Sequence, residues 1–75
     1  MRHFDGHCLR DIRRERGMSR DQLAAAAARS SQSVIMYEQG RGLPSVRTVA
    51  ALADVLGVEI DELFIEVDAS PARAS

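Results

Sequence analysis

The sequence has little of what secreted and strand-rich proteins depend on. Among its 75 residues are one cysteine, Cys8, one tyrosine, two phenylalanines and no tryptophan. A single cysteine cannot form a disulfide within the chain, which excludes a small secreted fold held together by disulfides. The scarcity of aromatic residues, together with alanine-rich stretches at 24–28 and 50–53, disfavours strands and indicates short helices.

Long apolar runs are also missing. No stretch approaches the length that spans a membrane, and the N-terminus has no apolar signal-peptide core, so we expect a cytoplasmic protein. Apolar residues nevertheless make up 45% of the chain, which is enough for one compact core. We therefore expect a single folded domain that is too small for a deep enzyme cleft.

The net charge is only −1, but the charges are unevenly distributed. Residues 1–50 contain nine arginines and five acidic residues, a net charge of +4, whereas residues 51–75 contain one arginine and six acidic residues, a net charge of −5. An accidental asymmetry is one interpretation. The other is a basic face for phosphates and an acidic face turned away from them.

Capping residues and glycines mark two predicted helices at the start of the chain. The first begins after Asp5, a candidate N-cap, and ends at Gly17. The second begins after Ser19, where Gln22 three residues later completes a capping box. The alanine run carries this second helix to about Ala28.

Two further helices follow the same rules. Ser30 can cap a third helix that ends at Gly40, and Ser45, after a turn containing Pro44, can cap a fourth that ends at Gly57. Helical spacing predicts the buried positions to be Val34 and Tyr37 in the third helix, and Val46, Val49, Leu52, Ala53 and Leu56 in the fourth.

The last part of the chain predicts a short fifth helix, with a strand as the alternative. Apolar and acidic residues are interleaved there, the apolar ones being Val58, Ile60, Leu63, Phe64 and Ile65. From Asp68 onward the sequence has nothing to bury. We therefore predict an all-α, compact five-helix domain over residues 1–67 and a flexible tail over 68–75.

The second and third helices stand in a specific relation. About three residues join them, which is the connection that a DNA-reading helix-turn-helix uses. The positions that agree in order and spacing with one known family are Leu9-Arg10, Gly17-Met18-Ser19, Leu23-Ala24, Ser30, Val34, Tyr37-Glu38, Gly40, Pro44-Ser45, Leu52-Ala53, Leu56-Gly57-Val58 and Asp61-Glu62-Leu63. By these residues the chain resembles the XRE family, which includes the phage repressor and Cro proteins. The resemblance implies a five-helix, repressor-like DNA-binding domain whose recognition helix covers about 30–38.

Two positions in the turn depart from the family pattern. Ala28 stands where the family usually has glycine, in a turn where a left-handed backbone is common. An alanine in that conformation costs on the order of 1 kcal/mol, so we expect a strained turn or a different geometry. Arg29 stands where the family often has a small aliphatic residue.

Burying Val34 and Tyr37 leaves another set of side chains on the outer side of the recognition helix. The candidates for base contact are Ser31, Gln32, Ile35 and Met36. Glutamine pairs with adenine N6 and N7, serine can donate or accept a hydrogen bond, and methionine or isoleucine contacts a thymine methyl. These chemistries favour A·T pairs, although each side chain has the alternative of being only a solvated or packed helix residue.

Phosphate contacts require cations and free backbone amides beside the groove. Helix N-termini supply such amides together with the positive end of a dipole. The candidates are Ser19, Arg20, Arg29, Arg41, Ser45 and Arg47, against the alternative that each charge is simply solvated. By resemblance, Glu38 is expected to form a structural ion pair with Arg13.

Metal binding and catalysis find little support in the sequence. His3, His7 and Cys8 are close together, but no second ligand cluster completes a tetrahedral zinc site. No nucleophile is grouped with a base and an orienting acid, and no glycine-rich phosphate loop is present. We therefore expect no enzymatic activity, cofactor, metal or small-molecule substrate. The partner implied by the resemblance is double-stranded DNA.

A homodimer is expected because one small domain offers too few base contacts to find its site in a genome. Its predicted interface comprises Ile60, Phe64, Ile65 and Val67, with Leu63 expected in the core and closure of the monomer core as the alternative role for the others. A second hypothesis for the whole protein is a protein-interaction module, antitoxin-like or sigma-factor-binding, that uses the apolar Ile35 and Met36.

Overall fold

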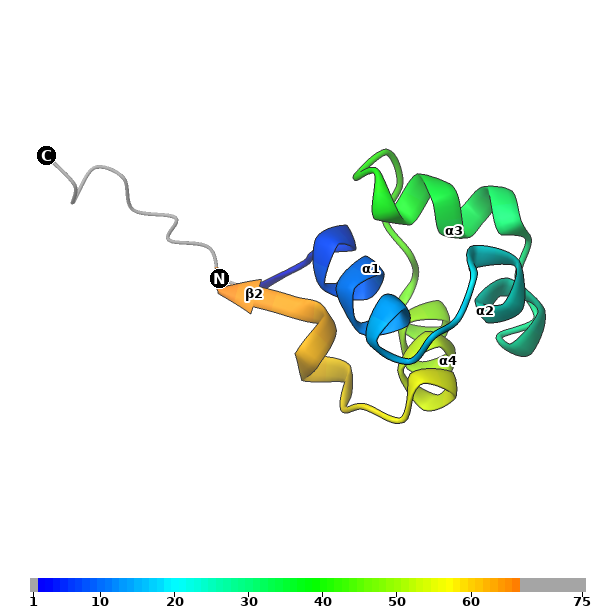
Figure 1. The fold of residues 1–75 in the computed structure, drawn as a ribbon. Coiled ribbons are helices and arrows are strands. Elements are labelled where there is room, and N and C mark those ends of the chain that lie inside the picture. Colours follow the sequence, from blue (N-terminus) through cyan, green and yellow to red (C-terminus); the bar gives the residue numbers. More distant parts are fainter. Residues whose placement is uncertain (1, 67–75) are drawn as a thin grey trace, which may run out of the picture.

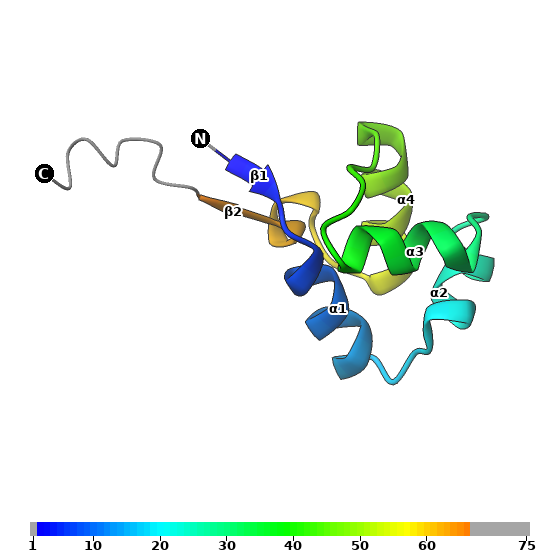
Figure 2. The ribbon, with the colours of Figure 1, turned by 90° about the horizontal axis from the view of Figure 1, so that it is seen from above.

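The computed structural model describes residues 2–66 of the chain. Its elements are, in order, β1 (Arg2–Phe4), α1 (Gly6–Glu15), α2 (Arg20–Ala26), α3 (Ser31–Glu38), α4 (Val46–Leu56), the 3-10 helix η1 (Ile60–Leu63) and β2 (Phe64–Glu66). The α-helices pack together, and the two strands lie at the opposite end of the molecule from α2 (Figures 1 and 2). The mostly helical character is confirmed, whereas the count of five helices is not, because residues 2–66 form four α-helices and one short 3-10 helix.

Side-chain caps begin the α-helices where the sequence predicts. Asp5 accepts a hydrogen bond from a backbone N–H in the first turn of α1, and Ser19 and Gln22 form the reciprocal capping box of α2. Ser30 and Ser45 likewise accept from the third N–H of α3 and α4. Each cap satisfies a helix-terminal donor and contributes about 1 kcal/mol. The starts of the α-helices are therefore determined locally.

The predicted fifth helix is present only as the short 3-10 helix η1, and a strand follows it. The backbone becomes extended at Phe64, with φ −118° and ψ 152°, and β2 pairs antiparallel with β1, placing Phe4 opposite Phe64 and His3 opposite Ile65. The Phe4 and Phe64 rings meet edge to face with centroids 6.2 Å apart, and both pack against the core. Strand pairing therefore partly buries two aromatic side chains against each other and the core, and the strand alternative is confirmed for residues 64–66.

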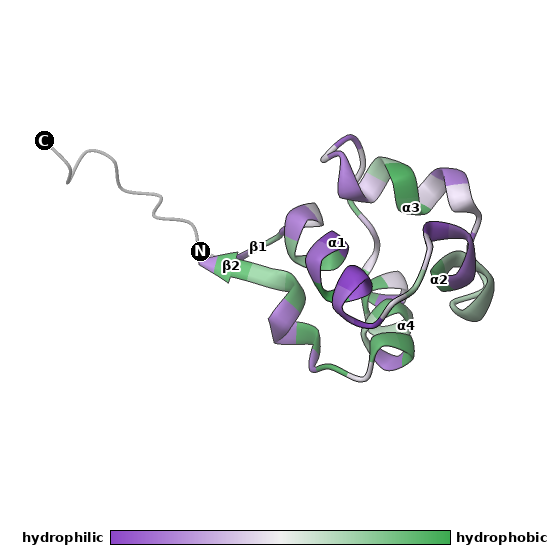
Figure 3. Cartoon of the chain, in the orientation of Figure 1, coloured by the Kyte–Doolittle hydropathy of each residue, from purple (hydrophilic) through white to green (hydrophobic). Residues whose placement is uncertain are grey.

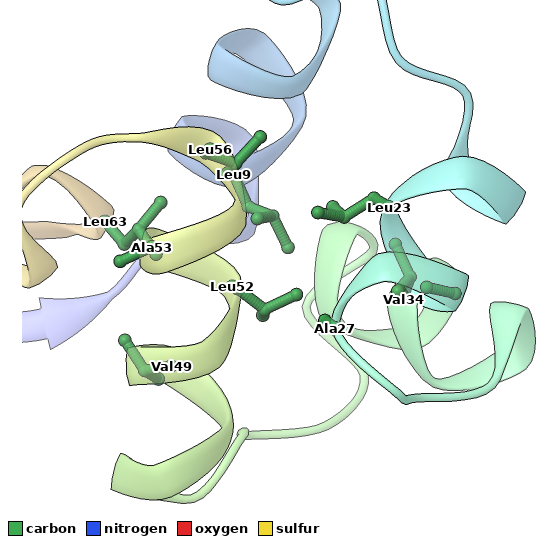
Figure 4. Packing of buried hydrophobic residues seen from close by; sticks show 10 residues of the cluster. Leu9, Leu23, Ala27, Val34, Val49, Leu52, Ala53, Leu56 and Leu63 are labelled. Atoms are coloured by element: carbon green, nitrogen blue, oxygen red, sulfur yellow. The ribbon is translucent and has the colours of Figure 1, made fainter.

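The core joins the four α-helices and η1 (Figure 4). Its fully buried side chains are Leu9, Leu23, Val34, Val49, Leu52, Leu56 and Leu63. Each contributes on the order of 1.5–3 kcal/mol by leaving water. Two predicted core positions differ: Val46 is 79% exposed, since the first turn of α4 lies at the rim of a surface groove, and Tyr37 is only half-buried.

Gly6 is buried at the point where α1 meets the end of α3. A Cβ atom on Gly6 would lie 2.0 Å from the carbonyl oxygen of Tyr37 and 2.9 Å from the Cα of Glu38. Backbone atoms cannot approach a side chain so closely, so only glycine fits. This close contact was not predicted from the sequence.

Within residues 2–66, no helix has both the length and the apolar character that crossing a membrane requires. Val67 and the predicted tail, 68–75, lie outside the described residues. The boundary between domain and tail therefore stays a prediction.

Candidate nucleic-acid interface

α3 has one buried edge and an accessible outer side. Val34 and Glu38, one turn apart, are 0% and 5% exposed, whereas Gln32 and Met36 are exposed. Seen from above, α3 lies across the near face of the molecule with no other ribbon in front of it (Figure 2). A helix presented in this way can enter a DNA major groove, which is about 12 Å wide.

The other two candidates for base contact are less accessible. Ser31 is half-buried, and its hydroxyl donates to the carboxylate of Asp21 on α2. Ile35 is also half-buried and lines a shallow groove of about 430 Å³ between the end of α1, the start of α2 and α3. The structure therefore leaves Gln32 and Met36 on the outer side of α3 and turns the two neighbouring candidates toward α1 and α2.

Three of the arginines predicted to contact phosphates are exposed. Arg20 lies in the first turn of α2, Arg41 in the loop after α3, and Arg47 in the first turn of α4. The hydroxyls of Ser19 and Ser45 act as N-caps, each accepting from a backbone N–H of its own helix. Because these hydroxyls are already hydrogen-bonded as N-caps, the groups left to bind a phosphate at these positions are the free backbone N–H groups of the helix termini.

Arg29 is half-buried, and its guanidinium makes hydrogen bonds inside the molecule. It donates to two carbonyl oxygens of the turn and to the hydroxyl of Thr48 on α4. A phosphate contact by Arg29 would therefore compete with these internal hydrogen bonds. No local pattern in the sequence pairs Arg29 with Thr48, since 19 residues separate them.

Glu38 accepts hydrogen bonds from two arginines. The Nε and Nη2 of Arg13 lie 2.6 Å and 3.1 Å from its two carboxylate oxygens, and the Nε of Arg20 lies 3.2 Å from one of them. The side chains of Arg13 and Glu38 are only 8% and 3% exposed, whereas that of Arg20 is 46% exposed. Arg13 thus forms a buried two-point ion pair, and Arg20 adds a partly exposed contact that the sequence did not indicate.

The N-terminal histidines and cysteine do not assemble a site. Among residues 2–66, no group of three histidine, cysteine or acidic side chains is placed to hold a metal ion. Cys8 is half-buried, and its thiol lies 3.5 Å from a carboxylate oxygen of Asp5. Burial and the Asp5 carboxylate both raise the pKa of this thiol, which keeps it in the less reactive protonated form.

Apolar side chains are exposed near the two-stranded sheet. Ile60 and Ile65 are 39% and 42% exposed, while Phe64 is half-buried and Leu63 is fully buried as predicted. Figure 3 shows β2 as apolar except at its tip, at the end of the molecule away from α2. Next to the sheet is a groove of about 260 Å³, lined by Arg2, His3, Phe4, Leu43, Pro44, Val46, Val49 and Phe64.

Comparison with known proteins gives a consistent set of relatives. A family model described as a helix-turn-helix domain matches residues 6–63. The chain is 35% identical over 71 residues to an uncharacterized HTH-type transcriptional regulator, y4dJ, of Sinorhizobium fredii, covering 95% of this chain and 92% of the relative. It is 34% identical over 71 residues to a putative HTH-type transcriptional regulatory protein of Methanothermobacter thermautotrophicus, covering 95% of this chain but only 22% of that relative.

Solved structures share the fold. The restriction-modification controller protein C.AhdI of Aeromonas hydrophila superposes with a TM-score of 0.76 at 31% identity, over 77% of this chain and 88% of that one. The biofilm master regulator SinR, solved in complex with DNA, gives 0.75 at 25% identity, over 77% and 94%. Hydroxypropylphosphonic acid epoxidase of S. wedmorenis gives 0.72 at 27% identity, but the match covers 77% of this chain and only 31% of the enzyme.

Proposed function

The chain belongs to the helix-turn-helix domain family, of the XRE kind that its sequence resembles, and on that premise we propose that it is a DNA-binding transcription regulator reading the major groove with α3. One observation carries the proposal: α3 buries Val34 and Glu38 and leaves Gln32 and Met36 exposed on an uncovered helix. A regulator of this kind acts on DNA in the cytoplasm. Its proposed activity is binding, without catalysis.

In this proposal the outer side of α3 reads bases. Gln32 pairs with adenine through its amide, and Met36 contacts a thymine methyl group. Ser31 and Ile35 contribute less, because the Ser31 hydroxyl is engaged by Asp21 and Ile35 lies partly against the neighbouring groove. The expected half-site is therefore rich in A·T pairs.

Phosphates on either side of the groove are bound by residues from three elements. The proposed set is Ser19 and Arg20 at the start of α2, Arg41 in the loop after α3, and Ser45 and Arg47 at the start of α4. The N-termini of α2 and α4 carry partial positive charge. This charge acts together with the arginines beside it, Arg20 and Arg47. The excess of arginine in residues 1–50 supports this arrangement despite the net charge of −1.

The protein is proposed to bind a two-fold-related operator as a homodimer. Ile60 and Ile65 are exposed apolar side chains close to the sheet, and the predicted interface also includes Val67 and the half-buried Phe64. Most acidic residues of the second half of the chain are close in sequence to this surface, so the dimer would keep them away from DNA. Two recognition helices would then lie about 34 Å apart, one turn of DNA.

Selection of bound duplexes from a random pool tests the proposal. Once a sequence is selected, Gln32→Ala and Met36→Ala should relax sequence preference, each base contact being worth about 1–3 kcal/mol. Arg20→Ala and Arg41→Ala should weaken binding to all duplexes alike and lower the slope of log K against log salt. The reverse pattern, with Arg20→Ala leaving the slope unchanged and Gln32→Ala lowering every affinity equally, would show that the two faces are assigned wrongly.

The competing function is a protein-interaction module. It is favoured by the exposure of Met36, at 38%, on the same face of α3. Salt discriminates the two, because binding that neutralises phosphates weakens steeply as salt rises. Failure of the wild-type protein to retard any duplex at low salt would favour the interaction module.

A further inference from the structure

The turn between α2 and α3 adopts a backbone conformation that its residue disfavours. Ala28 has a φ of 57°, in the left-handed region, where a Cβ atom is crowded by the following carbonyl. Backbone hydrogen bonds close the turn, from Ala28 N to the carbonyl of Ala25 at 3.2 Å and from Arg29 N to that of Ala24 at 2.8 Å. Something beyond the preference of Ala28 must hold this geometry.

The side chain of Arg29 is positioned to do so. Its Nη1 donates to the carbonyl oxygens of Ala27 and Ala28, at 3.3 Å and 3.0 Å. These carbonyls lie at the C-terminal end of α2, where a positive charge is also favoured by the helix dipole. One guanidinium group thus binds both peptide groups that flank the left-handed residue.

The same guanidinium reaches α4. Its Nε donates to the hydroxyl oxygen of Thr48 at 3.1 Å, and that oxygen also accepts from the hydroxyl of Ser45 at 3.1 Å. Thr48 is only 6% exposed, and its backbone N–H donates to Ser45, the N-cap of α4. Arg29 therefore links the turn that sets the direction of α3 to the terminus of α4.

We propose that Arg29 is a positioning residue that fixes the orientation of α3 relative to the start of α4, so that base-reading and phosphate-binding groups meet one DNA duplex together. The inference rests on the proposed function, because it names how the DNA-binding face is held in shape. α3 begins at Ser31, two residues after Arg29, so a change in the turn moves its N-terminal end first. Gln32 lies at that end.

Two variants separate this role from a direct phosphate contact. Arg29→Ala removes the link, whereas Arg29→Lys keeps the charge but replaces the planar fork with a single ammonium, which cannot bind the three acceptors in the same geometry. Affinity is measured by mobility shift for the duplex that the wild type selects and for a scrambled duplex. Measurements are made over a range of salt, at a temperature where circular dichroism shows every variant folded.

Positioning predicts that Arg29→Ala lowers affinity for the selected duplex about tenfold, with less than about a twofold change for the scrambled one and an unchanged salt slope. Arg29→Lys should restore little. Thr48→Val should reproduce the loss and add little to Arg29→Ala, whereas Thr48→Ser, which keeps the hydroxyl, should restore binding. Arg47→Ala is the comparison for a phosphate contact, and Val55→Ala, a half-buried residue of α4, is the control for lost stability alone.

The opposite results overturn the inference. Equal loss on both duplexes with a salt slope lowered by about one unit, rescued by Arg29→Lys, would make Arg29 a phosphate contact like Arg47. Unchanged affinity for both duplexes would make its hydrogen bonds purely stabilising. If the wild-type protein selects no DNA sequence, the proposed function fails, and the positioning role of Arg29 fails with it. If the wild-type protein does select a sequence but Arg29→Ala gives an equal loss on both duplexes or no loss at all, only the role of Arg29 is overturned.

Discussion

Among single residues, Ala28 is the alanine that adopts a left-handed backbone conformation, which alanine disfavours. Replacing it with glycine should raise the free energy of unfolding by about 0.5–1 kcal/mol, because relief of the left-handed strain exceeds the entropy that glycine adds to the unfolded chain. Urea unfolding measures the change. Ala25→Gly is the matched control: Ala25 lies within α2, so glycine there should destabilise by about 1 kcal/mol. A loss of stability in both variants would contradict the strained turn.

Glu38 is the residue on which the buried charges depend. Glu38→Gln removes the only negative charge that the structure gives Arg13 as a partner within residues 2–66, and it leaves a cation that is 8% exposed. The expected loss is about 3–5 kcal/mol, measured by urea unfolding.

Glu15→Gln serves as the control for this substitution. Glu15 is also paired with an arginine, but its side chain is 70% exposed and the separation is 4.0 Å, so the change should stay within about 0.5 kcal/mol. Melting of Glu38→Gln within a degree or two of the wild type would mean that Arg13 finds another partner or water.

At the scale of elements, the contact between α1 and α3 leaves no room for a side chain at Gly6. Gly6→Ala should destabilise by about 1–3 kcal/mol or more, because the backbones must separate to admit one methyl group. Gly42→Ala is a matched control, since the nearest atom to its added Cβ would lie 3.8 Å away, an ordinary contact, and little change is expected. Equal thermal stability of the two variants would show that α1 shifts freely over α3.

The α-helices and the sheet differ in how far the sequence could predict them. The α-helix starts were predictable because each depends on one residue and its N-cap hydrogen bond, as at Ser19 and Ser45. β1 was not, because three residues, Arg2–Phe4, are too few to show an alternating pattern, and their pairing with β2 connects opposite ends of the domain. The helix predicted after Gly57 is present only as the 3-10 helix η1, Ile60–Leu63, because the pairing of β2 with β1 makes the backbone extended from Phe64 onward.

The candidate site divides in a similar way. The outer position of Gln32 and Met36 follows from helical spacing once Val34 is buried, so sequence alone could place them. The engagement of Ser31 by Asp21 and the internal use of Arg29 could not be predicted, because both depend on where another helix packs. Spacing predicts which side of a helix is exposed, but it does not predict which exposed groups are already bound.

For the whole molecule, the proposed dimer predicts that a charge introduced on the surface near the sheet reduces self-association. Ile65→Asp places a charge on a side chain that is 42% exposed and should reduce self-association in sedimentation at micromolar concentration, because the charge would be buried at the interface. Binding of the selected operator should fall in parallel, since two half-sites would no longer be held together.

Ala25→Asp, on the exposed surface of α2 at the far end of the molecule, is the control and should leave association unchanged. Phe64→Ala is a second probe, although Phe64 also packs against Phe4, so its effect on stability must be measured as well. A wild-type protein that stays monomeric even on its operator would end the dimer hypothesis, as would undisturbed association of Ile65→Asp.

The pairing of β1 with β2 brings the two ends of the described chain together, with Arg2 opposite Glu66. A domain that is entered and left at one point is well suited to modular construction, because it can be appended to or inserted into a larger protein without stretching a linker across its surface. Sequence similar to this domain covers 22% of the longer Methanothermobacter thermautotrophicus relative, and the same fold covers 31% of the epoxidase. A fluorescent or affinity label fused beside the strands should accordingly stay clear of α3, on another side of the molecule, but it would lie next to the proposed dimer surface (Figure 1).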